Sequence, residues 1–280
     1  MTSEQRSTAL KKYFLPTPPK PKHAAQIFWM IVGGLLLLGS FASGLMTVVE
    51  DVDGGVLCCS GIAFFVGGGI FLTNLISFYT TESKYRAEYR KAEPKPSDEQ
   101  VDSWFAQDKQ YIIKDAIRKL DLEEEQIVNI DAPLVVVGPQ SLAKFKIGKD
   151  GIIRFSAYEI VVIYLTNYHL GAYSCEWDFV RSRVINEQTQ EYHYTDVVSV
   201  ATLTSNSNFS LVTPDGKEHP IKRHQQFSLS VASGESIKIT VNFPEVEKIF
   251  KEGKLQPTGA DRAIQVLRSM LREKKGGSRM

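Results

Sequence analysis

The sequence of 280 residues lacks any large excess of charge of one sign, and it contains only 3 cysteines and 5 histidines. With 33 Lys and Arg against 32 Asp and Glu, it has no overall field that would gather nucleic acid, and we expect no nucleic-acid partner. Three cysteines cannot form a disulfide framework, and two of them, Cys58 and Cys59, fall in an apolar run. The polar part of the chain therefore suits a reducing compartment.

Motifs for catalysis and for cofactor binding are also missing. Gly148-Lys149 has neither the earlier glycine nor the following Ser or Thr of a phosphate-binding loop. His219 and His224 are five residues apart, but no third and fourth ligand follow at the spacing of a metal site. Cys175 has no histidine close in sequence to activate its thiol. We therefore expect a chain without catalytic residues, metal or cofactor.

Long hydrophobic runs, by contrast, dominate the N-terminal third. Residues 27–49 and residues 55–79 contain no charged side chain over 23 and 25 positions. About 20 helical residues cross the roughly 30 Å of hydrocarbon in a bilayer, so both runs are long enough. A secretory signal would be shorter and would end at a small-residue cleavage site, and the other alternative is a pair of buried core helices. We predict a transmembrane helical hairpin over residues 27–79.

The distribution of cations predicts the orientation of this hairpin. Nine Lys and Arg flank the two runs, whereas the short acidic connection at residues 50–54 has none. They are Lys11, Lys12, Lys20, Lys22, Lys84, Arg86, Arg90, Lys91 and Lys95. Because cytoplasmic flanks carry the excess of Lys and Arg, we expect an inner-membrane protein with both termini in the cytoplasm.

Small residues recur along both runs. The second run has one at every fourth position and the first has a shorter set: Gly55, Cys59, Ala63, Gly67, Ser40 and Gly44. In lipid such ridges allow close helix packing, either within one chain or between chains of a homo-oligomer. Asn74 is the strongly polar residue of these runs and suits a hydrogen bond rather than an ion site. We therefore interpret the hairpin as an anchor or assembly element in the lipid bilayer.

The remaining sequence divides into three segments. Residues 1–26, with lysines and four prolines, predict a disordered basic tail. Residues 80–130 predict a charged linker and an amphipathic helix that begins with the capping box of Ser97 and Gln100. Residues 131–275 predict a cytoplasmic β domain.

The β domain is indicated by short runs rich in Val, Ile, Tyr and Thr between turn signals. Asp150-Gly151 and Asp215-Gly216 are hairpin signals, and Ser233-Gly234 is a weaker one. A C-terminal amphipathic helix follows from residue 260, with cations in its last turns. The fold class predicted is α+β, with a small antiparallel barrel or sandwich that the C-terminal helix covers.

Two short motifs in this region resemble bacterial pleckstrin-homology-like (PH-like) domains. Residues 165–170, Leu-Thr-Asn-Tyr-His-Leu, resemble the family's Leu-Thr-Asn/Asp-x-basic-Leu hairpin, with His169 in place of the more usual Arg. Residues 194–200, Tyr-Thr-Asp-Val-Val-Ser-Val, resemble its Tyr-x-Asp-Ile-x-Ser-Val strand. The stretch 176–191 is longer than a simple hairpin connection of that family. The resemblance covers roughly residues 145–271 and implies a barrel with a packed C-terminal helix, frequent linkage to membrane helices, and no common catalytic residue.

Binding is the function that these features favour. A basic set on neighbouring predicted strands could accept an anionic headgroup, nucleotide or acidic peptide: Lys217, Lys222, Arg223 and Lys238. The interleaved Glu218 and Glu235 equally suit a solvated face. We expect a non-catalytic, homo-oligomeric, membrane-anchored binding, scaffold or sensor domain with a protein or anionic ligand. Alternatives are a signal-activated effector whose hairpins assemble to perturb the bilayer, and a membrane-bound enzyme, which would need a cleft lined by perturbed titratable groups.

Overall fold

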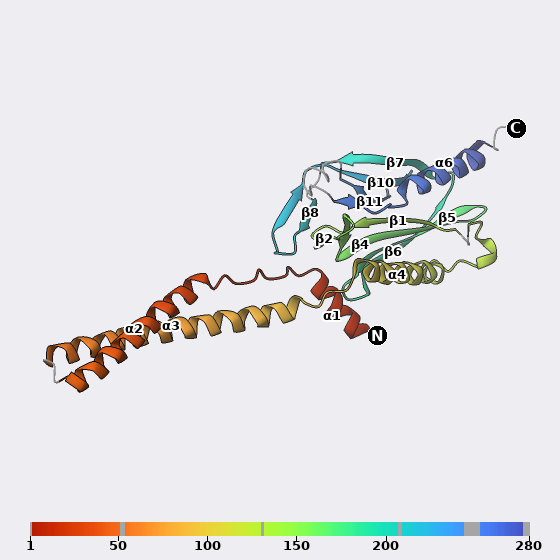
Figure 1. Cartoon of the computed structure of the whole chain (residues 1–280). Coiled ribbons are helices and arrows are strands. Elements are labelled where there is room, and N and C mark those ends of the chain that lie inside the picture. The colour runs from red at the N-terminus through yellow and green to blue at the C-terminus, as the bar shows by residue number, and fades with distance from the viewer. Residues whose placement is uncertain (1, 51–53, 130–131, 207–208, 244–252, 277–280) are drawn as a thin grey trace. The chain divides into compact units, whose positions relative to one another are not determined.

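The computed structural model describes residues 2–50, 54–129, 132–206, 209–243 and 253–276 (Figure 1). The chain divides into two compact units. The helical unit is Thr17–Glu93, and the β unit combines Met1–Pro16 with Pro94–Met280. The β unit is thus assembled from both ends of the chain.

The helical unit consists of α2 (Ala24–Glu50) and α3 (Gly54–Ala92). Two stretches, Ala24–Ser43 and Ser60–Ala92, are long and apolar enough to cross a membrane. Only 11% and 6% of their most apolar windows are buried, whereas a core helix of a soluble protein would be mostly buried. Large apolar side chains such as Leu38 and Phe65 are exposed. The helical unit therefore presents an apolar exterior.

The two helices meet at a pair of glycines. A Cβ atom at Gly33 of α2 would lie 2.8 Å from the Gly67 carbonyl oxygen of α3, and one at Gly67 would lie 2.8 Å from Leu36 Cβ. Backbone packs on backbone here, as small residues permit in apolar helices. Among the residues expected to pack, Gly67 and Ser40 are buried and Ala63 is half-buried. The burial of the other three lies outside what the structure describes: Gly44, Gly55 and Cys59.

The N-terminal segment corrects one expectation. Residues 1–26 were expected to be disordered, but α1 (Ser3–Tyr13) is a helix of the β unit. A capping box begins it, because the Thr2 side chain accepts from the Gln5 backbone N–H and the Gln5 side chain accepts from the Thr2 N–H. Three apolar side chains of its C-terminal end, Leu10, Tyr13 and Phe14, are buried in the β unit. Their burial stabilises the helix. The prolines that follow the helix led to the prediction that the whole segment is disordered.

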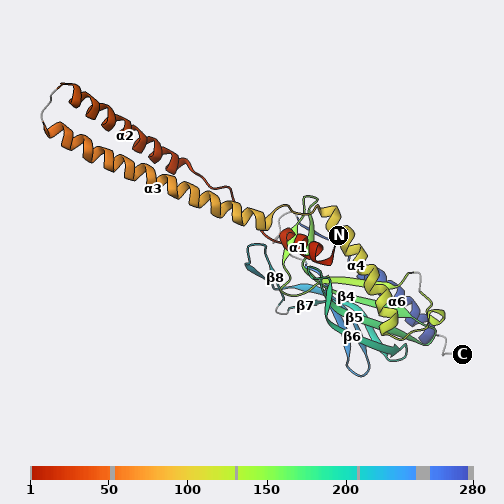
Figure 2. The same ribbon diagram turned by 90° about the horizontal axis from the view of Figure 1, so that it is seen from below.

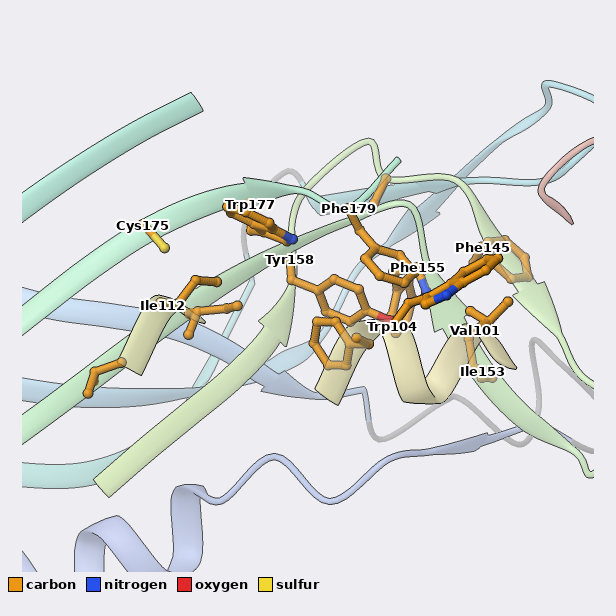
Figure 3. Packing of buried hydrophobic residues seen from close by; sticks show 14 of the residues in the cluster. Val101, Trp104, Ile112, Phe145, Ile153, Phe155, Tyr158, Cys175, Trp177 and Phe179 are labelled. Carbon is orange, nitrogen blue, oxygen red and sulfur yellow. The ribbon is translucent and has the colours of Figure 1, made fainter. Parts of the chain in front are cut away.

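The predicted amphipathic helix is α4 (Asp98–Lys119). Ser97 is its N-cap and accepts a hydrogen bond from the Gln100 backbone N–H at 3.2 Å, which is one of the two hydrogen bonds of the predicted capping box. The apolar face of α4 packs into a cluster of buried side chains (Figure 3). In that cluster the rings of Phe105 and Tyr158 are stacked, with centroids 4.1 Å apart. The helix therefore docks on the β strands that follow it.

Two antiparallel sheets form the body of the β unit. The first has the order β1 (Leu134–Pro139), β4 (Ala157–Leu165), β5 (His169–Asp178) and β6 (Arg183–His193). The second has the order β11 (Ser236–Asn242), β10 (His224–Val231) and β7 (Val197–Ser205). Smaller sheets are β12 (Lys254–Leu255) with β3 (Ile152–Phe155) and β2 (Phe145–Ile147), and β8 (Phe209–Val212) with β9 (Glu218–Ile221).

The first sheet is buried on both faces. Along β4, Ile160, Val162 and Tyr164 belong to the cluster with α4, and the alternate residues Val161 and Ile163 belong to a second cluster. That second cluster also contains side chains of the second sheet and of α6 (Ala260–Gly276). Alternation between two apolar faces explains why β4 is an almost continuous apolar run. The β unit is layered as helix, sheet, and sheet with helix (Figures 1 and 2).

The sheets do not close into a barrel, so of the predicted barrel or sandwich the barrel is wrong. The residues before α6 occupy the outer edge of β1: Val137 N–H donates to the Thr258 carbonyl at 2.9 Å. Gly259 follows with φ +78°, and a Cβ atom there would lie 2.2 Å from the Val135 carbonyl oxygen. The edge of β1 that a barrel would pair with β11 is therefore taken by the chain entering α6. The predicted α+β class and C-terminal helix are confirmed.

Gly259→Ala is expected to lower the free energy of unfolding of the β unit by about 1–3 kcal/mol. The added Cβ would collide with a backbone oxygen that cannot move without distorting β1, and φ is positive. Chemical denaturation followed by circular dichroism would measure the loss. Gly216→Ala is the matched control, because Gly216 also has positive φ but nothing lies within 4 Å of its would-be Cβ. Equal losses in both variants would contradict the collision.

A buried arginine joins α4 to the β2–β3 hairpin. Arg154 of β3 is 1% exposed, and its guanidinium binds both oxygens of Asp102 at 2.8 and 2.7 Å and both oxygens of Asp150 at 3.0 and 2.6 Å. Asp98 lies 3.9 Å away and accepts a hydrogen bond from the Tyr13 hydroxyl of α1 at 2.6 Å. The pKa of Asp150 is lowered to about 2, chiefly by its hydrogen bond with Arg154. This network holds α1, α4 and the hairpin together.

Candidate functional site

An open groove of about 1290 Å³ runs between strand β7 and helix α6. One wall is the edge strand β7, which pairs only with β10 among the described strands. The other wall is the outer side of α6, whose opposite side is buried through Ala260, Ala263 and Leu267. The lining is mixed: Val197, Val198, Ser199, Val200 and Thr202 from β7, and Asp261, Ile264, Gln265, Arg268, Leu271, Arg272, Lys275 and Gly276 from α6. Such a groove suits an extended ligand.

Two cations of α6 reach across this groove to backbone oxygens of β7. Arg268 donates from Nε and Nη2 to the Val200 carbonyl at 3.1 and 3.0 Å. Lys275 donates from Nζ to the Val197 carbonyl at 2.6 Å. Arg272 lies between them in sequence and also lines the groove. Positions 268, 272 and 275 follow the spacing that places side chains on one helical face, so the sequence carried this signal, although the cations were interpreted only as a response to the helix dipole.

A second hollow, of about 270 Å³, contains two carboxyl groups side by side. Glu159 of β4 is directly opposite Glu176 of β5, and Lys238 of β11 also lines the hollow. Glu176 accepts hydrogen bonds from the side-chain amides of Gln140 and Asn186, each at 2.8 Å. Burial and then the charge of Glu176 raise the pKa of Glu159 to about 7. The pair can therefore hold one proton near neutral pH.

The free energy of unfolding is expected to fall as pH rises from about 4.5 to about 7, because Glu159 keeps its proton in the folded state and loses it in the unfolded state. Below pH 4.5 both states are protonated and the effect vanishes. Glu159→Gln should remove this slope and stabilise the protein by about 1–3 kcal/mol at pH 8. Urea titrations at pH 4.5 and pH 8 measure it. An unchanged slope in the variant would contradict the burial of this carboxyl group.

The structure does not bring the predicted basic set together. Lys217 lies in the β8–β9 turn and pairs with Asp215 at 3.1 Å, and Lys222 and Arg223 lie between β9 and β10. Lys238 is opposite Ser228 of β10, five residues along the chain from Arg223. At about 3.3 Å per residue this separates the two positions by about 17 Å. One small anion could not contact all four residues.

The other polar candidates are accounted for in the described part of the chain. Cys175 is buried against α4, and burial raises the pKa of its thiol to about 12, which disfavours the reactive thiolate. Desolvation lowers the pKa of His224. Within the described ranges, no three His, Cys, Asp or Glu side chains are grouped as a metal site would require. Asn74, in α3, donates to the Ile70 carbonyl of its own helix at 2.8 Å, as a hydrogen-bonding residue would.

Comparison with known proteins identifies no relative. No family model, curated protein or solved structure matches the chain. The groove and the hollow are therefore interpreted from their own geometry.

Proposed function

We propose that the chain is a membrane-anchored, non-catalytic binding protein whose β unit lies in the cytoplasm. The observation that carries the anchor is the exposed apolar exterior of α2 and α3, with 11% and 6% of their apolar windows buried. In water this surface would be costly, because each exposed square ångström of apolar area forgoes about 25 cal/mol of burial. In a bilayer the same surface is solvated by lipid chains.

The assembly of the β unit from both ends of the chain supports the proposed topology. Helix α1 precedes the apolar hairpin and β2 to β5 follow it, yet their side chains share one apolar cluster. Segments that pack together must lie on the same side of a membrane, so the chain between them crosses an even number of times. The cations that flank the hairpin then favour the cytoplasmic side of the inner membrane.

A PH-like domain is the family to which we assign the β unit in this proposal. The main strands form a four-stranded sheet and a three-stranded sheet. The chain passes from the first sheet to the second between β6 and β7, and it ends in a helix. The two motifs that carry the resemblance also meet: the Tyr194 hydroxyl donates to the Thr166 carbonyl at 2.7 Å. Residues 176–191, which counted as a departure, continue β5 and form most of β6.

Binding is favoured over bilayer perturbation by the packing of the hairpin. Gly67, on which assembly of several hairpins would depend, is covered by α2 of the same chain. The groove between β7 and α6 offers backbone groups, hydroxyls and cations, which suit recognition of a partner. Self-association of the anchor is a further part of the proposal, but it would have to use a face of the hairpin other than the one at Gly67; chemical crosslinking in native membranes tests it.

Membrane insertion is tested with a pair of cationic substitutions. Leu38→Lys and Phe65→Lys place charges on side chains that are 69% and 79% exposed. In a bilayer each charge costs about 2.5–3.5 kcal/mol, so the double variant should be lost from alkali-washed membranes. The control is Tyr89→Lys, at an exposed position beyond the uncharged run of α3. A double variant that fractionates like the wild type would overturn the anchor.

A further inference from the structure

The outer edge of β7 is protected in an unusual way. An edge strand exposes unpaired backbone groups, and proteins cover or block such edges to prevent unwanted pairing. Here the cover consists of two flexible side chains, Arg268 on the Val200 carbonyl and Lys275 on the Val197 carbonyl. A side chain can leave a carbonyl far more easily than a packed helix or a proline can be removed. The edge is therefore covered but can be opened.

We propose that the groove between β7 and α6 binds an acidic, extended segment of a partner protein, which adds to β7 as a further strand. This inference rests on the proposed binding function and names its partner class. Backbone hydrogen bonds to a sheet edge provide affinity in such strand addition, and side chains of the segment provide specificity.

Docking replaces the hydrogen bonds that the edge of β7 makes with the two cations by hydrogen bonds with the segment. When a segment docks, its backbone N–H groups take over the carbonyl of Val200 and, across the register shift at Val198, that of Val197, and the two cations are released from them. Released cations inside a groove need anionic partners, because an unpaired charge next to protein is costly. Carboxylates of the docked segment satisfy that need with charge-assisted hydrogen bonds.

The charge of the groove selects the partner. Its lining contains three cations, Arg268, Arg272 and Lys275, against one carboxylate, Asp261. A basic segment would be repelled, and a neutral one would leave the released cations unpaired. Val198, 62% exposed, adds an apolar contact for one side chain of the segment. A lipid headgroup would match the charge but has no row of N–H donors for the strand edge, so we favour a peptide.

The probe is a fluorescent eight-residue peptide of alternating glutamate and valine, titrated onto the full-length protein in detergent and followed by anisotropy. The first control peptide has lysine in place of glutamate. The second has the acidic sequence with alternate peptide nitrogens methylated, so that charge is kept and backbone donation is lost. We expect the acidic peptide to bind at least tenfold more tightly than either control.

Two protein variants separate the contributions of charge and backbone. Arg268→Gln with Lys275→Gln should weaken the acidic peptide at least tenfold, whereas Arg262→Gln, on α6 but outside the groove lining, should leave binding unchanged. Thr202→Pro keeps every cation but removes an N–H from the outer edge, because position 202 shares the outward direction of Val200 in the β7–β10 ladder. Peptide binding should fall at least tenfold there too. Far-ultraviolet circular dichroism confirms that each variant is folded.

Equal binding of the methylated and unmethylated acidic peptides, or displacement by millimolar inorganic phosphate, would identify a plain anion site and overturn strand addition. Full binding by Thr202→Pro would do the same. The anchor is judged separately by the Leu38→Lys and Phe65→Lys fractionation. Binding of the acidic peptide by a protein that is not retained in membranes would remove the proposed function and leave this inference standing.

Discussion

Arg154→Met is expected to lower the free energy of unfolding of the β unit by about 3–5 kcal/mol at pH 7, the cost of breaking a buried ion pair. Methionine fills much of the space but leaves three carboxylates near one another, those of Asp98, Asp102 and Asp150. Asp102 and Asp150 are partly exposed and can regain water, so we expect the loss of stability to lie near the lower end of this range. Urea denaturation followed by tryptophan fluorescence measures the change.

The pH dependence identifies the cause. In the wild type, Asp150 contributes stability above its ordinary pKa, and this contribution is lost as pH falls through about 2. In the variant the carboxylates repel one another, so their protonation relieves strain and the difference from the wild type should shrink between pH 7 and pH 4. Arg118→Met is the control, because Arg118 is 74% exposed and its pair with Asp115 contributes about 0–1 kcal/mol. A loss independent of pH would indicate a packing defect instead.

Asp108→Ala is expected to cost about 3–4 kcal/mol and to release α1 from the β unit. Asp108 of α4 is buried, accepts two hydrogen bonds from Arg6 of α1 at 2.8 and 2.5 Å, and accepts a third from Trp177 Nε1 at 3.0 Å. Without the carboxylate, a largely buried guanidinium and an indole N–H both lose their acceptor. Protease cleavage within Ser3–Tyr13 should therefore become much faster than in the wild type.

Two variants define the cause of that loss. Asp108→Asn keeps the shape and one acceptor, so it should cost about 1–2 kcal/mol. Asp115→Ala changes the same residue type on the same helix, but its partner Arg118 is exposed, and less than about 1 kcal/mol is expected. If α1 stays protected in Asp108→Ala, then its apolar contacts through Leu10, Tyr13 and Phe14 suffice to hold it.

Local patterns in the sequence predicted most elements of this fold. The capping box at Ser97 located the start of α4, and the Asp-Gly pairs located turns in which Gly151 and Gly216 have positive φ. The apolar runs predicted α2 and α3, because their composition depends on no partner in the chain. Such signals are visible because their causes lie within a few residues of one another.

The features that the sequence did not reveal depend on distant partners. Thr2 and Gln5 form a capping box, but α1 is stabilised by side chains about a hundred residues away, such as Asp108. β6 ends at His193 and β7 begins at Val197, because the chain changes sheet at Tyr194, whose hydroxyl donates to the Thr166 carbonyl. The barrel failed for the same reason, since Thr258 occupies the edge of β1. The groove, too, exists only once α6 is placed beside β7.

The assembly of the β unit from both ends of the chain has a consequence for its synthesis. Helix α1 leaves the ribosome before its partners, because Arg154 and Trp177 are made more than 140 residues later. At about 5–20 residues per second, α1 waits roughly 7–30 s for its partners. The hairpin between them is complete well before that time. Helix α1 is therefore translated before the hairpin but is among the last elements to reach its native place, and the fold of the β unit closes only after the hairpin has been made.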